Sequence, residues 1–193
     1  MPPGPPPFGS YSWAYIEAAK MLASEVRKKY PTLDIMGAPL VFLYRHAMET
    51  ALKDIFGLLS KSKMTQPVCT PESFQHNLEK LLDAVEAEVE THIAGHRTSR
   101  ELDEIPLSLT APFRLPEETR KTLAAFNDKQ YPERYPAEKW RQEYDFDKFE
   151  SECDSALYDL DWTDKLIKEV AFLKSGKPRF EPEEWEQGDA ESP

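Results

Sequence analysis

The chain contains few cysteines and few glycines, and each shortage excludes a class of site. Its 193 residues include only Cys69 and Cys153, too few for a disulfide framework and too widely separated for a zinc knuckle. Seven glycines leave little material for phosphate-cradling loops, and the Gly-x-Ser-x-Gly turn of serine hydrolases is absent. We therefore expect a cytoplasmic protein in a reducing environment that uses no metal and no other cofactor.

Long apolar runs are also missing from the sequence. No run reaches the roughly 18 consecutive apolar residues that indicate a membrane-spanning helix. Residues 1–9 are rich in proline and have neither the basic nor the apolar region of a signal peptide, so we expect a disordered lead-in. The sequence thus predicts a protein without a membrane partner.

Positive charge is scarce: 24 lysines and arginines face 35 acidic residues, which gives a net charge of −11. Six of these negative charges lie in residues 181–193, which contain no lysine or arginine, so −5 remains on the rest of the chain. We expect residues 178–193 to form a disordered acidic tail that could contact a protein partner. The mildly acidic remainder argues against non-specific nucleic-acid binding unless basic groups cluster on one face.

The seventeen prolines bracket long proline-free tracts and so act as boundaries of helices. Apolar residues at three- and four-residue steps predict helices in four tracts, with a further short helix after Pro116: 10–30, 40–59, 71–95 and 146–174. A proline-rich connector over 97–115 should pack across them. The sequence predicts one all-α domain over 10–177, an up-and-down bundle of four to five helices.

The clearest amphipathic pattern lies in the third predicted helix, after Thr70-Pro71. Its apolar stripe consists of Phe74, Leu78, Leu81, Val85, Val89 and Ile93. His92 and His96 stand one turn apart in the same tract, but Ile93 occupies the position where helical metalloproteases place a glutamate. The two histidines therefore indicate a polar helix end rather than a metal site.

A charged row interrupts the second predicted helix. Arg45, Glu49 and Lys53 lie four residues apart, so they are neighbours on one helical face, with His46 beside them. An exposed row would be a set of surface ion pairs. A buried row would instead mark a dimer interface or an RNA-binding groove.

Three short segments together resemble a known family: Arg45-His46-x-x-Glu49-x-x-Leu52-Lys53, His76-Asn77-Leu78-Glu79-Lys80-Leu81-Leu82 and Arg134-Tyr135-Pro136. In order and spacing they are similar to the signatures of bacterial HEPN-like (higher eukaryotes and prokaryotes nucleotide-binding) helical-bundle proteins, over roughly residues 10–175. The resemblance implies an RNA-directed protein, and for many members a metal-independent endoribonuclease of toxin or defence type. The family's catalytic arginine and the polar residue after it would correspond to Arg45 and His46. The motif is incomplete, because its histidine would fall at 50–52, which are Thr50, Ala51 and Leu52.

These considerations give a candidate site and two function classes. Arg45 and His46 are the predicted catalytic residues, as phosphate-binding cation and general base. The predicted binding residues are Glu49, Lys53, His76, Arg134 and Tyr135.

His76 is a second candidate base, or else it bonds a backbone carbonyl or the Glu49 carboxylate. We expect the second and third helices to pack antiparallel, with the polar cluster near the two-fold axis of a homodimer. The alternative to an RNA-directed protein is a non-catalytic dimeric scaffold or partner-binding module.

Overall fold

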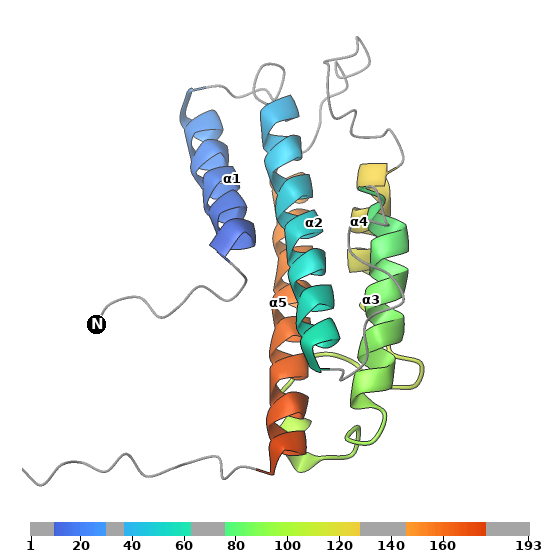
Figure 1. Ribbon diagram of the computed structural model, residues 1–193. Helices are drawn as coiled ribbons and strands as arrows, with labels where there is room; N and C mark the ends of the chain where they lie inside the picture. The colour runs from blue at the N-terminus through green and yellow to red at the C-terminus, as the bar shows by residue number, and fades with distance from the viewer. Residues whose placement is uncertain (1–9, 30–36, 63–75, 128–145, 177–193) are drawn as a thin grey trace, which may run out of the picture.

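The computed structural model of the chain describes residues 10–29, 37–62, 76–127 and 146–176 (Figure 1). These ranges contain five α-helices, one short 3-10 helix and no strand. The α-helices are α1 (Ser10–Lys29), α2 (Gly37–Ser62), α3 (Leu78–Ile93), α4 (Glu117–Asn127) and α5 (Phe146–Ser175). The predicted all-α bundle of four to five helices is confirmed. The predicted lead-in 1–9 and acidic tail 178–193 lie outside the described residues.

The core is formed mainly by α2, α3 and α5, with α4 completing it. Figure 1 shows α2 in front of α5 and α3 in front of α4, while α1 lies along the outer side of α2. The described members of the predicted α3 stripe are all buried: Leu78, Leu81, Val85, Val89 and Ile93. Burial of these apolar faces is what stabilises the helices, since isolated helices of this length are marginal in water.

The helices α2 and α5 run in the same direction, as the contacts near their first turns show. The rings of Tyr44 and Phe149 pack edge to face with their centroids 5.7 Å apart. Phe126 at the end of α4 contacts the same Phe149 ring at 6.3 Å, so α4 runs antiparallel to α5. Both contacts lie at one end of the bundle.

Two further contacts orient α3. Its first residue, Leu78, donates its backbone N–H to Asn127 at the end of α4 over 3.1 Å. In its last turn, His92 Nε2 lies 3.2 Å from the carbonyl oxygen of Ile167 in the second half of α5. Helix α3 is therefore antiparallel to α4 and parallel to both α5 and α2.

The expected antiparallel packing of the second and third helices is wrong. Up-and-down alternation holds for α1 with α2, α3 with α4 and α4 with α5, but α2 and α3 run parallel. The physical reason is the length of the connection. Thirteen residues separate Ser62 from His76, and an extended chain of that length spans about 40 Å, enough to return along α2.

Helix α3 also begins later than the sequence predicts. His76 and Asn77 are not helical, and Asn77 is the N-cap, since its side chain accepts a hydrogen bond from the Lys80 N–H over 3.0 Å. The predicted start at Thr70-Pro71 falls outside the described residues. Gly176, with φ of +62°, ends α5 as predicted.

The connector between α3 and α4 is irregular except for the 3-10 helix η2 (Arg100–Leu102), and it is tied to α3 by two carboxylates. Fully buried Glu86 accepts the backbone N–H of Leu115 over 2.9 Å and also pairs with Arg114 and Arg120. Glu90 accepts the N–H of Phe113 over 2.6 Å. The predicted packing of this proline-rich connector against the bundle is confirmed by its buried apolar residues, Leu102, Leu107, Phe113 and Leu115.

No helix in the four described ranges is both long and apolar enough to cross a membrane.

Replacing Leu78 with alanine should lower the free energy of unfolding by about 2–5 kcal/mol, because it empties a fully buried site in the core. Chemical denaturation followed by circular dichroism measures the change. The matched control is Lys80→Ala in the same turn, which is exposed and should change stability by no more than about 0.5 kcal/mol. Equal effects of the two substitutions would contradict this packing of α3.

Candidate functional site

The charged row of α2, a strip along one side of this helix, faces the beginning of α3, since Arg45 and Glu49 both contact His76. Arg45, Glu49 and Lys53 stand one turn apart along this strip, as their spacing predicts. Arg45 and Lys53 are half-buried, whereas the Glu49 side chain is only 1% exposed. The row is therefore neither a fully solvated surface nor a fully buried interface.

Glu49 is the centre of this site. One carboxylate oxygen, Oε1, accepts from Lys53 Nζ over 2.6 Å and lies 2.7 Å from His76 Nδ1. Burial alone would raise the pKa of Glu49, but the hydrogen bonds and charges of Lys53 and His76 outweigh it, so the pKa is lowered. The carboxylate is therefore ionised at neutral pH. Its other oxygen, Oε2, is buried without a hydrogen-bond partner in the described part of the chain.

His76 adopts an unusual backbone conformation directly before the N-cap of α3. Its φ of +69° is left-handed, which is uncommon outside glycine and costs conformational energy. Two contacts with α2 hold His76 in this conformation. Its ring Nδ1 lies 2.7 Å from Glu49 Oε1, and its carbonyl oxygen accepts a hydrogen bond from Arg45 Nη2 over 2.8 Å. The imidazole is nevertheless 67% exposed. The fold thus presents an oriented histidine ring to solvent.

The next residue, Asn77, anchors this histidine to the opposite side of the bundle. Its Oδ1 caps α3 and also lies 3.2 Å from Nδ2 of Asn127, the last residue of α4. Sequence reasoning missed both asparagines. Asn77 carries a usable signal, an asparagine followed by Glu79 in the first turn, which is typical of a helix start. The role of Asn127 depends on a contact distant in sequence and has no local signal.

His46 points away from this group and towards α1. Its ring meets Tyr15 edge to face at 4.3 Å between centroids and stacks on Phe42 at 5.5 Å with an interplanar angle of 10°. Burial is the main cause of its lowered pKa, so the ring is neutral at pH 7. Arg45 and His46 diverge because adjacent residues on a helix point about 100° apart.

The structure thus brings together Arg45, Glu49, Lys53 and His76. The His76 ring contacts the Glu49 carboxylate, one of the contacts that the sequence suggested, and this contact leaves the role of the ring open. His46 is not part of this group, but the charges of the group affect the pKa of its ring. Arg134 and Tyr135 fall outside the described residues.

The described ranges contain no group of three potential metal ligands. His92, one of the two histidines at the end of α3, is buried and contacts the Ile167 carbonyl oxygen instead.

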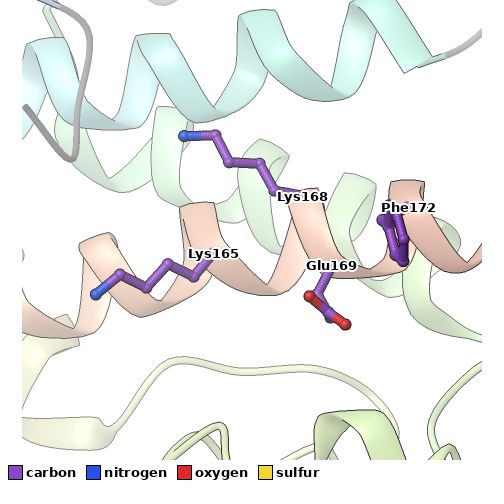
Figure 2. A pocket seen from close by; sticks show the side chains of 4 residues that line it. All are labelled: Lys165, Lys168, Glu169 and Phe172. Carbon is purple, nitrogen blue, oxygen red and sulfur yellow. The ribbon is translucent and has the colours of Figure 1, made fainter. Parts of the chain in front are cut away.

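Apart from this group, a hollow of about 390 Å³ opens along α5 and is lined by Lys165, Lys168, Glu169 and Phe172. Figure 2 shows that all four side chains come from this one helix and that the two lysines extend in different directions. Both lysines form ion pairs on α5: Lys165 with Asp161 over 2.6 Å and Lys168 with Asp164 over 2.5 Å. Since these acids offset the positive charge, the hollow is a weaker candidate for an anionic ligand than the group around Glu49.

Comparison of the chain with protein-family models, curated proteins and solved structures finds no match.

Replacing Glu49 with glutamine should destabilise the fold by about 1–3 kcal/mol at pH 7, because charge-assisted hydrogen bonds to Lys53 and His76 are weakened. The folded-state pKa of Glu49 lies below its ordinary 4.5. The stability that the ionised Glu49 carboxylate contributes is therefore fully present above pH 4.5 and is lost as the pH falls through the folded-state pKa.

Urea denaturation of both proteins as a function of pH measures this difference. The gap between wild type and Glu49→Gln should narrow as the pH falls below 4.5. Glu79→Gln, which alters an exposed carboxylate near the start of α3, is the control. A gap that stays constant across the acid range would mean that the charge of Glu49 contributes nothing to folding.

Proposed function

We propose that this chain is an RNA-directed, HEPN-like protein. It cleaves the phosphodiester bonds of RNA without a metal, with His76 as the general base. The observation that carries the proposal is the contact between buried Glu49 and the exposed ring of His76. A carboxylate that orients an imidazole is a recurrent arrangement for proton transfer. The family resemblance of the Arg45 and His76 segments supports the choice of RNA.

The tautomer of His76 follows from its partner. An ionised carboxylate only accepts hydrogen bonds, so in the neutral ring Nδ1 carries the proton and Nε2 keeps its lone pair. No hydrogen bond from the described residues occupies Nε2, and the ring is mostly exposed. It is therefore suited to take a proton from a ligand in solution.

Arg45 and Lys53 supply the positive charge that a phosphodiester requires. They stand on either side of Glu49 along α2, with Arg45 bonded to the His76 carbonyl oxygen and Lys53 to the Glu49 carboxylate. The row thus consists of two cations with one carboxylate between them. Such fixed cations stabilise the additional negative charge that develops on a phosphate during attack.

The proposed reaction uses the 2′-hydroxyl of RNA as nucleophile. Its proton passes to His76 Nε2 while the 2′-oxygen bonds to phosphorus and the bond from phosphorus to the 5′-oxygen breaks. The leaving 5′-oxygen takes a proton from water, and His76 returns its proton to the hydroxide formed. The products are a 2′,3′-cyclic phosphate and a 5′-hydroxyl end, so DNA of the same sequence is not a substrate.

Substituting His76 with alanine should lower the cleavage rate about 100- to 10,000-fold, the usual contribution of a general base. The assay uses a labelled single-stranded RNA with EDTA present, and mass spectrometry identifies the ends. His96→Ala, which removes a half-buried histidine beyond the end of α3, is the matched control and should retain full activity.

Three results would refute this assignment or the mechanism behind it. The first is an unchanged cleavage rate for His76→Ala together with a loss of cleavage for His46→Ala. That result would identify His46, the residue predicted from the sequence, as the general base. The second is the absence of cyclic-phosphate ends from the wild-type digest. Cleavage of an otherwise identical DNA strand would refute the 2′-hydroxyl mechanism.

A second candidate function, a non-catalytic dimeric scaffold, is favoured by the outer face of α1. Tyr11 is 75% exposed and Met21 is 70% exposed, although both are large and apolar. Exposed apolar groups on one helix are typical of protein interfaces. A homodimer through this face is compatible with either function. Both functions are also compatible with a protein partner that binds the acidic tail and with a cytoplasmic location.

The double substitution Tyr11→Ser with Met21→Ser should convert a dimer to a monomer if α1 forms the interface, because it removes apolar area that association would bury. Sedimentation equilibrium gives the mass. Tyr158→Ser, at an exposed aromatic on α5, is the control and should leave the mass unchanged. A wild-type protein that is already monomeric, or a double variant that stays dimeric, would rule out this interface.

A further inference from the structure

Phe42 is an exposed aromatic residue on the same strip of α2 as the candidate site. Its side chain is 46% exposed although it is large and apolar. It lies one turn before Arg45 and His46, and two turns before Glu49. At 1.5 Å rise per residue, its Cα is about 10 Å from that of Glu49 along the helix axis.

The orientation of the Phe42 ring is fixed by its neighbour. Its plane is within 10° of that of His46, at a centroid distance of 5.5 Å. His46 is in turn held at its other side by Tyr15 of α1, whose ring meets it edge to face. His46 thus covers one side of the Phe42 ring, and because 46% of the Phe42 side chain is exposed, a flat group could stack on the part that His46 does not cover.

A nucleobase is a flat group of this kind, and aromatic side chains bind unpaired bases by stacking. The cation Arg45 follows Phe42 by about one turn on the same strip, so a base on Phe42 would place the adjoining backbone phosphate near Arg45. Lys53 stands about 16 Å beyond Phe42 along the helix axis, where it could meet a later phosphate. A base inside a duplex is paired and stacked on its neighbours, so it is not available to this ring.

We infer that Phe42 is a base-stacking residue that restricts the ligand of this site to single-stranded RNA with an unpaired base next to the bound phosphate. This inference rests on the proposed function, because it names the substrate class of the same site. Phe42 is a specificity-determining residue in this scheme. It takes no part in proton transfer.

RNA binding and RNA cleavage are measured separately to test the stacking role of Phe42. Binding uses His76→Ala protein, to prevent cleavage, and a fluorescent single-stranded RNA beside the same RNA annealed to its complement. In that background Phe42→Leu, which keeps an apolar side chain but removes the aromatic face, should weaken binding of the single strand about 5- to 150-fold. Phe42→Trp should bind at least as tightly as the parent, and the duplex should bind weakly to all three proteins.

The control is Tyr158→Leu, which removes an equally exposed aromatic ring on α5 and should leave RNA binding unchanged. Thermal melts of each variant ensure that only folded proteins are compared.

The outcomes separate this inference from the proposed function. If the wild type cleaves RNA and His76→Ala does not, but Phe42→Leu binds as tightly as its parent, the stacking role is wrong and the proposed activity stands. If Phe42→Leu changes only the mass in sedimentation, Phe42 is a contact between protein chains and the inference fails. If the wild type neither binds nor cleaves RNA, both fail together.

Discussion

The constraint on which the rest of the site depends is the burial of the Glu49 carboxylate within α2. A charge at 1% exposure requires compensation, and α2 itself supplies only Lys53. The second donor comes from His76, which brings the beginning of α3 beside the first half of α2. The parallel course of α2 and α3, the left-handed backbone of His76 and the Arg45 contact are all consistent with this one requirement.

Local patterns allowed much of the fold to be predicted. The stripe of α3 and the stop of α5 at Gly176 depend on neighbouring residues, and both are confirmed. The relative direction of α2 and α3 could not be obtained in this way, because it depends on contacts distant in sequence, such as those of His76 with Arg45 and Glu49 across 31 and 27 residues. The start of α3 also differs from the prediction, since Asn77 caps a helix that begins at Leu78.

The candidate site was predictable only where it follows helical spacing. Four-residue steps place Arg45, Glu49 and Lys53 together, and the structure shows the same row. Spacing does not reveal that Glu49 is buried or that His76 faces solvent, since both depend on how α3 packs. The proposal of His76 rather than His46 as the base therefore rests on the contacts of each ring, since His46 is flanked by two aromatic rings and His76 is held by a carboxylate.

Helix α1 packs on α2 through the buried side chains of Ile16, Ala19 and Ala23. Polar contacts add to this packing, since Ser12 donates a hydrogen bond to Asp54 of α2 over 2.8 Å and Arg27 pairs with Asp147 of α5 over 2.8 Å. Tyr15 covers the His46 ring from this helix. A local opening of α1 would take Tyr15 away from His46, so the solvent exposure of this histidine is coupled to the packing of α1 on α2.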